Sequence, residues 1–301
     1  MGGYAGPVPS TLELRATNDE LVLAGTLHLP DGEPRATVLM VPGSGPSDRD
    51  NDVYFPAIRA GLLERGIAAA SFDKRGVGES TGDWRNTGPA EQVADVAAQL
   101  ASLRESPEVE PTRLGVFGHS QGGWVVLEVA AADPSVSFVI TNSGPGVTMA
   151  RQERFATEAH MTAGGAPAEA VANALATQDA LVALVRSGAD LATVQATAGE
   201  DGHGPSDPAE LELVRRWLDH DPLPALERLT CPLLAIFGDQ DLFTPVEESI
   251  AVFRAARAGR PGGLDVATLP EADHRLQSGE PPALHPAYAA TLGDWIIRHG
   301  S

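Results

Sequence analysis

The stretch 114–131 constrains the fold of this chain more than any other, because it sets a serine between an apolar run and a helix-like run. The apolar run ends at Gly118, Ser120 follows, and Gly122 opens an amphipathic run that continues from Trp124. Small residues two positions before and after a serine leave room for a tight, strained turn that projects the hydroxyl out of the sheet. The pattern Gly-x-Ser-x-Gly in this setting predicts a nucleophile elbow with Ser120 as the nucleophile. A chance glycine-rich turn would not account for the strand and the helix on its two sides.

Apolar runs alternate with helix-like runs on both sides of the elbow. We expect a hairpin over 12–29, strands over 36–41, 67–72, 113–117, 136–141, 233–237 and 264–269, and helices over 54–65, 92–103, 124–132, 246–258 and 286–297. Short, continuous apolar strands that alternate with helices indicate the α/β class, with a mostly parallel sheet covered by helices on both faces.

The alternation is interrupted between about residues 147 and 228. This part contains helical runs such as 168–178 and 211–218, separated by glycine- and proline-rich segments, and no strand-like run. We therefore expect a core formed by 1–146 and 229–301, and a helical cap inserted as 147–228.

Composition excludes several classes of partner. The 301 residues carry a net charge of −20, which disfavours nucleic acid and anionic membrane surfaces. No uncharged apolar run approaches ~20 residues and no secretory signal is recognisable, so we expect a cytoplasmic protein without a membrane span. The single cysteine, Cys231, excludes an internal disulfide and is expected to be buried at a strand edge. Lys74 is the only lysine, which we attribute to genomic base composition.

A serine nucleophile needs a histidine base, and the base needs a carboxylate that fixes its tautomer. In an elbow of this kind the acid and then the histidine follow later strands. Asp239 and Asp241 come directly after the apolar run 233–237, and His274 lies in the loop after 264–269. From the residues alone either aspartate could be the acid or could cap the next helix, and His274 could be a solvated loop residue.

An oxyanion formed at this serine would need two backbone donors. One is expected to be the amide of Gln121, which follows the nucleophile, and the other the amide of Ser44 in the glycine-rich loop 42–50. His119 is expected to pack against its surroundings and not to catalyse. No histidine and carboxylate spacing suggests a metal site, and no cofactor is expected.

The motifs resemble those of the α/β-hydrolase superfamily over about residues 12–299, and in particular a bacterial esterase and serine-aminopeptidase-like branch with a helical cap. The similar segments are Gly43-Ser44-Gly45-Pro46-Ser47-Asp48-Arg49-Asp50, Asp73-Lys74-Arg75-Gly76-Val77-Gly78-Glu79-Ser80 and Gly118-His119-Ser120-Gln121-Gly122-Gly123. The resemblance implies a triad of Ser120, Asp241 and His274, with Asp241 preferred over Asp239 because it ends a G-x-x-D segment. It also implies Ser44 and Gln121 as oxyanion donors, and mainly structural roles for Asp73 and Arg75. Pro42 departs from the histidine that is usual at that position.

The expected activity is cleavage of a carboxylic ester of a small to medium apolar substrate through an acyl-enzyme. The same triad would also serve a thioesterase, lactonase, amidase or acyltransferase, because substrate choice is decided by the cap and its loops. A hypothesis of another class is a scaffold that binds a small molecule without turnover. An aspartate-nucleophile dehalogenase or epoxide hydrolase is disfavoured because position 120 is serine. The oligomeric state stays open.

Overall fold

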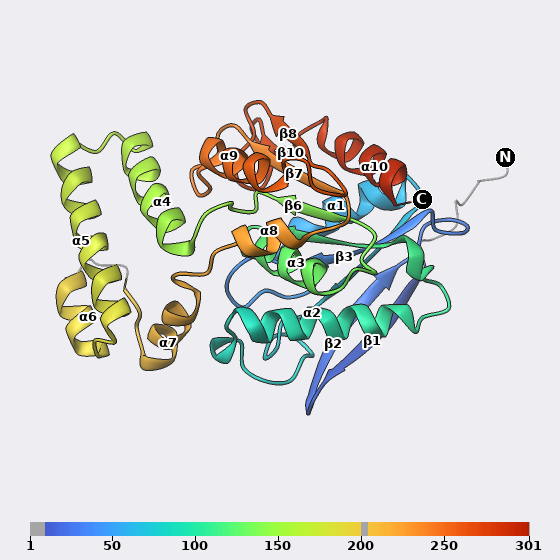
Figure 1. Ribbon diagram of the computed structural model, residues 1–301, viewed down its shortest axis with the longest axis horizontal. Helices are drawn as coiled ribbons and strands as arrows, with labels where there is room; N and C mark the ends of the chain where they lie inside the picture. Colours follow the sequence, from blue (N-terminus) through green and yellow to red (C-terminus); the bar gives the residue numbers. More distant parts are fainter. Residues whose placement is uncertain (1–9, 200–203, 301) are drawn as a thin grey trace.

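The computed structural model describes residues 10–199 and 204–300 and is built around an eight-stranded sheet (Figure 1). In spatial order the strands are β1 (Thr11–Asn18), β2 (Leu21–His28), β4 (Ile67–Phe72), β3 (Ala36–Val41), β5 (Leu114–His119), β6 (Val139–Asn142), β7 (Leu233–Gly238) and β8 (Asp265–Leu269). β1 and β2 form an antiparallel hairpin that pairs antiparallel with β4, and every pairing from β4 to β8 is parallel. The expected mostly parallel α/β sheet is therefore confirmed.

Helices cover both faces of the sheet, as the continuous apolar strands predict. On one face lie α1 (Tyr54–Leu63) and α10 (Tyr288–His299), and on the other lie α2 (Pro89–Arg104), α3 (Gln121–Ala132), α8 (Leu223–Arg228) and α9 (Val246–Arg257). Alternate residues of one strand serve the two layers, because successive side chains of a strand point to opposite faces. Val38 and Met40 of β3 pack toward α1 and α10, and Leu39 and Val41 pack toward α2 and α3.

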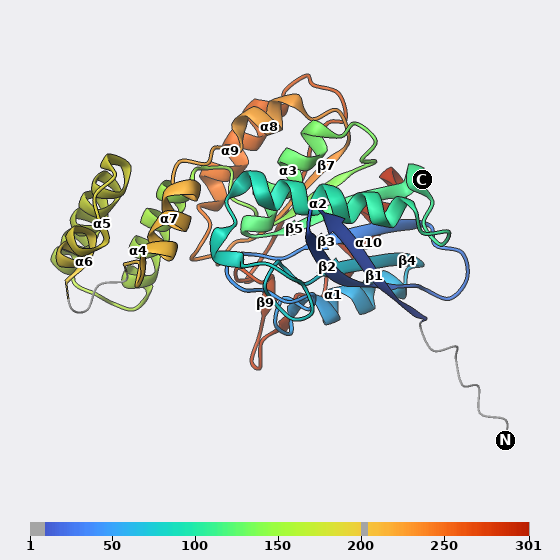
Figure 2. The same cartoon turned by 90° about the horizontal axis from the view of Figure 1, so that it is seen from below.

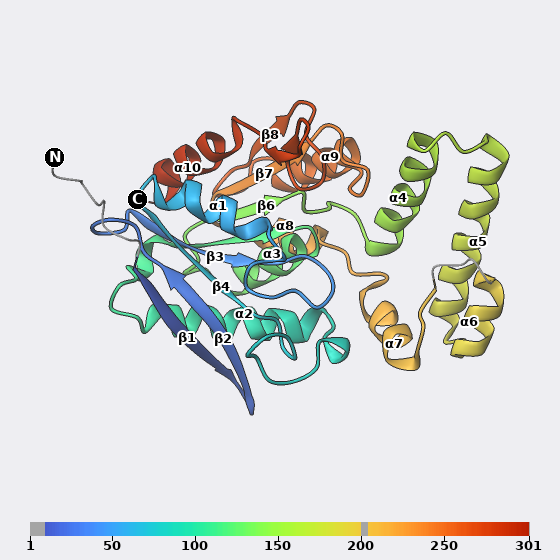
Figure 3. The ribbon, with the colours of Figure 1, turned by 180° about the vertical axis from the view of Figure 1, so that it is seen from behind.

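Four further helices stand outside these layers at one end of the molecule (Figures 1–3). They are α4 (Met149–Ala163), α5 (Ala168–Ser187), α6 (Leu191–Ala198) and α7 (Pro208–Trp217). They share a small core of Val185, Val194, Leu211 and Leu218. They fall within the region expected to form the cap, whereas α8, at the end of that region, packs against α3 and α9.

One side chain of α7 joins this helical group to the main core. Trp217 is 1% exposed, stacks on Trp124 of α3 with 6.0 Å between ring centroids, and donates its indole N–H to the Thr87 carbonyl at 3.0 Å. Buried aromatic rings contribute strongly to packing, and a buried indole N–H needs such an acceptor. The end of α7 is therefore fixed, while α5 and α6 lie farther out.

By length and composition alone, α5 is apolar enough to cross a membrane, with 20 residues and a mean hydropathy of 1.2. The helix nevertheless carries Glu169, Asp179 and Arg186, and it packs against α4, α6 and α7. These contacts place α5 within the group of outer helices α4–α7.

Shorter elements complete the chain. They are the 3₁₀ turns η1 (Trp84–Asn86) and η2 (Pro111–Arg113) and the two-stranded ribbon β9 (Gln277–Ser278) and β10 (Ala283–Leu284). The ribbon comes directly after the loop that carries His274 and was not expected from the sequence, because each of its strands has only two residues.

The turn between β5 and α3 depends on close contact between backbone segments. A Cβ atom on Gly118 would overlap the carbonyl of Gly122, and one on Gly122 would lie 2.5 Å from the Val41 carbonyl oxygen. A Cβ on Gly123 would lie 2.7 Å from the Cα of Gly144. None of these glycines has a positive φ, so glycine is required here because there is no room for a side chain, and not because of the backbone conformation.

We expect Gly118→Ala to destabilise the fold by about 2–3 kcal/mol, because an added methyl group in a packed backbone contact forces the neighbouring backbone to shift. The measurement is the midpoint and slope of urea unfolding. Gly164→Ala, in the outer helices, is the matched control, because its Cβ would lie 3.2 Å from the nearest atom. Equal unfolding midpoints for the two variants would contradict this account of the turn.

Candidate active site

The expected site residues, together with Lys74, follow the carboxyl ends of parallel strands. Ser44 comes after β3, Lys74 after β4, Ser120 after β5, Asp241 after β7 and His274 after β8. Because these strands are parallel, their carboxyl ends meet at one edge of the sheet, where open α/β sheets place their sites. Helices α4 and α7 contribute side chains to the cavities at the same edge.

Ser120 has the backbone conformation that an elbow requires. Its φ of 52° and ψ of −121° lie where serine is rarely found, and its N–H donates to the Asn142 carbonyl at 2.9 Å, which helps hold the turn. The residue is 9% exposed and immediately precedes the first residue of α3. The strained backbone thus sets the hydroxyl at the amino end of a helix, where free amides and the helix dipole favour negative charge.

Asp241 is buried and contacts His274. Its Oδ1 accepts the amides of Phe243 at 2.7 Å and Thr244 at 2.9 Å, and its Oδ2 lies 2.8 Å from His274 Nδ1. An ionised carboxylate only accepts hydrogen bonds, so we assign the imidazole proton to Nδ1. This tautomer leaves His274 Nε2 with a lone pair that can take a proton.

The neighbouring carboxylate of Asp239 has a different environment. It is exposed, and its Oδ1 accepts the Glu271 amide at 2.7 Å. This bond attaches the end of β7 to the loop that precedes His274. Between the two aspartates that the residues alone left open, Asp241 is therefore the one in contact with His274.

Ser120 and His274 line one cavity of about 510 Å³, which we call the wide cavity. Its wall also includes Asn51, Glu153, Phe243 and Arg275. Within residues 10–199 and 204–300 no hydrogen bond joins the Ser120 hydroxyl to His274. Hydrogen bonds between catalytic groups are often long without substrate and shorten in the reacting complex. This structure shows that Ser120 and His274 share a cavity and that the Asp241 contact fixes the tautomer of His274.

The loop after β3 lies against the turn that holds Ser120. A Cβ on Gly43 would be 3.4 Å from the Ser120 Cβ, so the Gly43–Ser44 backbone passes directly beside the candidate nucleophile. In the part of the chain that the structure describes, neither the Ser44 amide nor the Gln121 amide donates to a protein acceptor. Pro42 removes only its own N–H, so both expected donors remain.

Asp73 anchors the far end of this loop. Its Oδ1 accepts the Arg49 amide at 2.8 Å, and its Oδ2 pairs with the Arg49 guanidinium at 2.7 Å. Arg75 forms a second ion pair with Asp95 of α2 at 2.6 Å. Both contacts are of the bracing kind that the resemblance implies for Asp73 and Arg75.

Sequence reasoning gave little attention to His119 and none to Asn51. The His119 ring is buried, lies 5.2 Å from the His274 ring and 4.8 Å from the Tyr54 ring, and has its Nδ1 3.1 Å from Asn51 Nδ2. Burial and the neighbouring His274 lower the pKa of His119 well below its ordinary value, so the ring stays neutral. Asn51 belongs to no motif that signals it. Its φ of 47° is a property of the folded loop alone.

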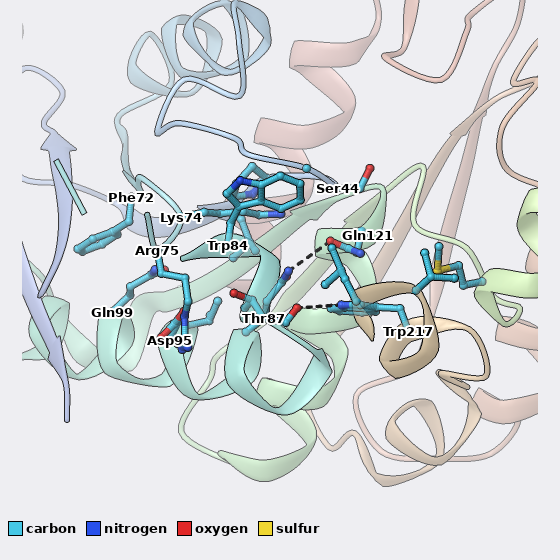
Figure 4. Close-up of a pocket in the computed structure, with 18 of the residues that line it drawn as sticks. Ser44, Phe72, Lys74, Arg75, Trp84, Thr87, Asp95, Gln99, Gln121 and Trp217 are labelled. Atoms are coloured by element: carbon cyan, nitrogen blue, oxygen red, sulfur yellow. Dashed lines mark hydrogen bonds and ion pairs between the residues drawn. The ribbon is translucent and has the colours of Figure 1, made fainter. Parts of the chain in front are cut away.

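A second, smaller cavity of about 150 Å³, which we call the narrow pocket, lies on the side of Ser44 and Gln121 (Figure 4). Its wall is mainly apolar and includes Phe72, Trp84, Leu213, Val214 and Trp217. Ser44 borders both cavities. Helix α7, which carries Leu213 and Val214, therefore closes the space beside the expected oxyanion donors.

Within residues 10–199 and 204–300 no group of three or more His, Cys, Asp or Glu side chains could hold a metal ion. Cys231 is a buried free thiol, as its position at the start of β7 predicts.

Comparison with known proteins gives the family to which the chain belongs. The model of the alpha/beta hydrolase family matches residues 38–288, so the chain belongs to that family. Esterase EstD of Thermotoga maritima is 26% identical over 86% of this chain and 59% of its own length. Thiohydrolase apmlB of Arthrinium phaeospermum is 31% identical over 41% of this chain and 39% of its own length. The structure of the Pyrococcus furiosus esterase Pf2001 superposes with a TM-score of 0.67 at 18% identity, covering 97% of this chain and 92% of the other.

The expectations of an α/β-hydrolase fold, an esterase-like branch and an enzyme of the hydrolase type are thus confirmed. The fold explains why such distant chains superpose: the sheet and the turn after β5 depend on apolar pattern and small residues, which many sequences satisfy.

The buried histidines lead to a prediction for acid stability. Burial lowers the pKa of His28 from 6.5 to about 4, and burial likewise lowers the pKa of His119 and of His220. Below pH ~6.5 the unfolded chain binds protons that the folded chain does not, so stability falls as the pH decreases from there toward the folded-state pKa values.

We expect the free energy of unfolding, measured with urea, to be lower at pH 5 than at pH 7 in the wild type, and this difference to shrink in His119→Gln. Glutamine can accept the Asn51 amide but has no proton to gain in this range. An unchanged difference in the variant would show that His119 does not contribute to it.

Proposed function

We propose that the chain is a serine hydrolase that cleaves a carboxylic ester, or a related acyl bond, of a small to medium apolar substrate. The observation that carries this proposal is the buried Asp241 carboxylate, held by two amides and bonded to His274 Nδ1 at 2.8 Å. His274 in turn borders the cavity that the strained Ser120 also borders. This is the relation between acid, base and nucleophile that acyl transfer requires.

Each group then has one task. The Ser120 Oγ attacks the acyl carbon as His274 Nε2 takes its proton, and the negative charge on the substrate oxygen is held by the amides of Ser44 and Gln121. His274 returns the proton to the leaving alcohol when the C–O bond breaks, and an acyl group remains on Ser120. Water, deprotonated by the same histidine, then attacks the acyl carbon; the bond from this carbon to Ser120 Oγ breaks, His274 returns the proton to Oγ, and the acid is released. The Asp241 carboxylate keeps its hydrogen bond to Nδ1 and stabilises the imidazolium formed in each half.

The two cavities support a division of the substrate. The narrow pocket is apolar and begins beside the expected oxyanion donors, so we assign the acyl chain to it. The wide cavity is open, contains Ser120 and His274, and carries charged groups such as Glu153 and Arg275, so we assign the leaving group to it. A pocket of about 150 Å³ suits a short acyl chain.

A thioester in place of an ester is the second candidate, because the matched region of one relative belongs to a protein named a thiohydrolase. The triad and the oxyanion donors would act in the same way, since only the leaving atom differs. Lactone or amide cleavage and acyl transfer would use the same groups too. A scaffold that only binds a small molecule would not need Ser120, His274 and Asp241 in this relation.

We expect Ser120→Ala to abolish labelling by a fluorophosphonate probe and to lower kcat/KM for nitrophenyl esters by at least ~10⁴-fold. Asp241→Asn is expected to lower it by roughly 10⁴-fold, because the imidazole loses the acceptor that fixes its tautomer. The matched control is Asp239→Asn, which keeps an oxygen for the Glu271 amide and is expected to stay near wild type.

Each outcome separates the candidates. Labelling of wild type together with ester turnover supports the esterase. Labelling with turnover of acyl thioesters but not of esters moves the assignment to thioester chemistry. Absence of labelling in a well-folded wild type would overturn the hydrolase mechanism and favour the binding scaffold, and equal loss in Asp239→Asn and Asp241→Asn would contradict the assignment of the acid.

The assignment of the cavities gives a further prediction. Leu213→Phe enlarges a half-buried side chain in the narrow pocket, and we expect the preferred acyl chain to shorten by about two carbons, because the added ring atoms occupy its volume. Leu242→Phe makes the same change in the wide cavity and should leave the acyl preference unaltered. The measurement is kcat/KM over nitrophenyl esters of increasing acyl length. The reverse pattern would mean that the acyl group occupies the wide cavity.

A further inference from the structure

Lys74, which the triad does not use, lies close to the expected oxyanion donors. It follows β4, the strand beside β3, and its Nζ donates a hydrogen bond to the carbonyl oxygen of Gly43. Its own amide donates to the Ser47 carbonyl at 3.1 Å. One residue therefore holds the loop after β3 at two points, on the two sides of Ser44.

The Lys74 amine forms a hydrogen bond to a backbone carbonyl and not an ion pair with a carboxylate. Within the described residues no carboxylate lies within 4.0 Å of its Nζ. Other ionisable side chains on the narrow pocket are Arg75 and Asp95, which pair with each other, and Glu210 on α7. Burial without a counter-ion lowers the pKa of Lys74 to about 7. The Lys74 amine is therefore buried at a cost in free energy, at a position where its hydrogen-bond partner is the Gly43 carbonyl.

The consequence follows from the geometry of one peptide unit. The Gly43 carbonyl and the Ser44 N–H belong to the same planar trans peptide, in which they point in opposite directions. A donor that holds the carbonyl on the Lys74 side therefore turns the Ser44 N–H away from Lys74. The Gly43 Cα lies beside Ser120, since a Cβ there would be 3.4 Å from the Ser120 Cβ.

The local backbone restricts this orientation on one side only. The Gly43–Ser44 peptide turns about ψ of Gly43 and φ of Ser44, and Gly43 has no Cβ that would restrict its ψ. Ser44 is not among the residues with a positive φ, and reversing the peptide would move its φ toward the region that residues with a Cβ rarely adopt, so the Lys74 hydrogen bond adds to this preference. Pro42, at the start of the loop, has no N–H that could form a bond of its own.

We propose that Lys74 is a positioning residue, whose hydrogen bond to the Gly43 carbonyl orients the Ser44 N–H toward the oxyanion formed at Ser120. Figure 4 shows Lys74, Ser44 and Gln121 together on the wall of the narrow pocket. The proposal rests on the proposed acyl-transfer function, because it concerns a donor that acts only when a tetrahedral oxyanion forms. Lys74 itself touches no reacting atom.

The test compares Lys74→Met with wild type in kcat, KM and inhibition by a trifluoromethyl ketone, which adds to a serine hydroxyl as a tetrahedral oxyanion. Methionine keeps the length of the side chain but has no donor. We expect kcat and the affinity for the ketone to fall by roughly 10²-fold each, the usual effect of losing one oxyanion donor, and KM to change less than about twofold. Arg15→Met, which replaces an exposed cationic side chain of β1 outside both cavities, should leave all three values near wild type.

Restoring the amine separates positioning from a loss of fold. In a Cys231→Ser background, Lys74→Cys can be alkylated by 2-bromoethylamine, whose bromide the thiolate displaces, so that an amine returns at the position of Nζ. We expect this treatment to recover most of kcat and of ketone affinity, with the thermal unfolding midpoint recorded before and after.

The outcomes are distinct from those of the nucleophile test. Equal changes in kcat and KM, unchanged ketone affinity in Lys74→Met, or no recovery on aminoethylation of a folded variant would overturn the role of Lys74. If Ser120→Ala keeps ester turnover, the proposed function fails first. If Ser120→Ala is inactive and Lys74→Met is as active as wild type, only the inference about Lys74 fails.

Discussion

The close contact between backbone segments at the turn after β5 is the constraint on which the rest of the site depends. Gly118 packs against the Gly122 carbonyl, and Gly123 packs against Gly144. With no side chains between them, the strand passes into α3 within one residue, and Ser120 takes a φ of 52°. The cost of this strained conformation is offset by the buried core around it, since α3 packs on both β5 and α2. A looser turn would leave the hydroxyl without a defined direction.

The parallel sheet then supplies the loops that surround this serine. Loops after β3, β4, β7 and β8 meet at the same edge, and each is held by its own contacts: Asp73 with Arg49, Lys74 with Gly43, and Asp239 with the Glu271 amide. Charged and polar groups therefore act mostly on backbone, fixing loops whose own sequences are rich in glycine and proline. Helix α7 completes the edge because Trp217 is inserted into the main core.

The sequence was sufficient where a local pattern has one structural solution. The strands, the turn at Ser120 and the positions of Asp241 and His274 after later strands follow from apolar runs and small residues, and the sheet agrees with them. Between Asp239 and Asp241 the residues alone were undecided, because both closely follow β7 along the chain. From the sequence, Lys74 was attributed only to base composition, since nothing in its neighbours along the chain shows that its hydrogen-bond partner is 31 residues away.

What the sequence by itself determined is the α/β class and the serine turn, because apolar periodicity and a glycine-flanked serine are properties of short segments; the likeness of its motifs to those of α/β-hydrolases added the expected chemistry. Only the tertiary structure decided which carboxylate meets His274, that His119 is buried against it, and that Lys74 holds the Gly43 carbonyl. It also decided that a narrow apolar pocket and a wide cavity that carries charged groups share Ser44 as a border. The physical reason is that these are contacts between loops distant in sequence, and their geometry is set by the register of the strands that carry them.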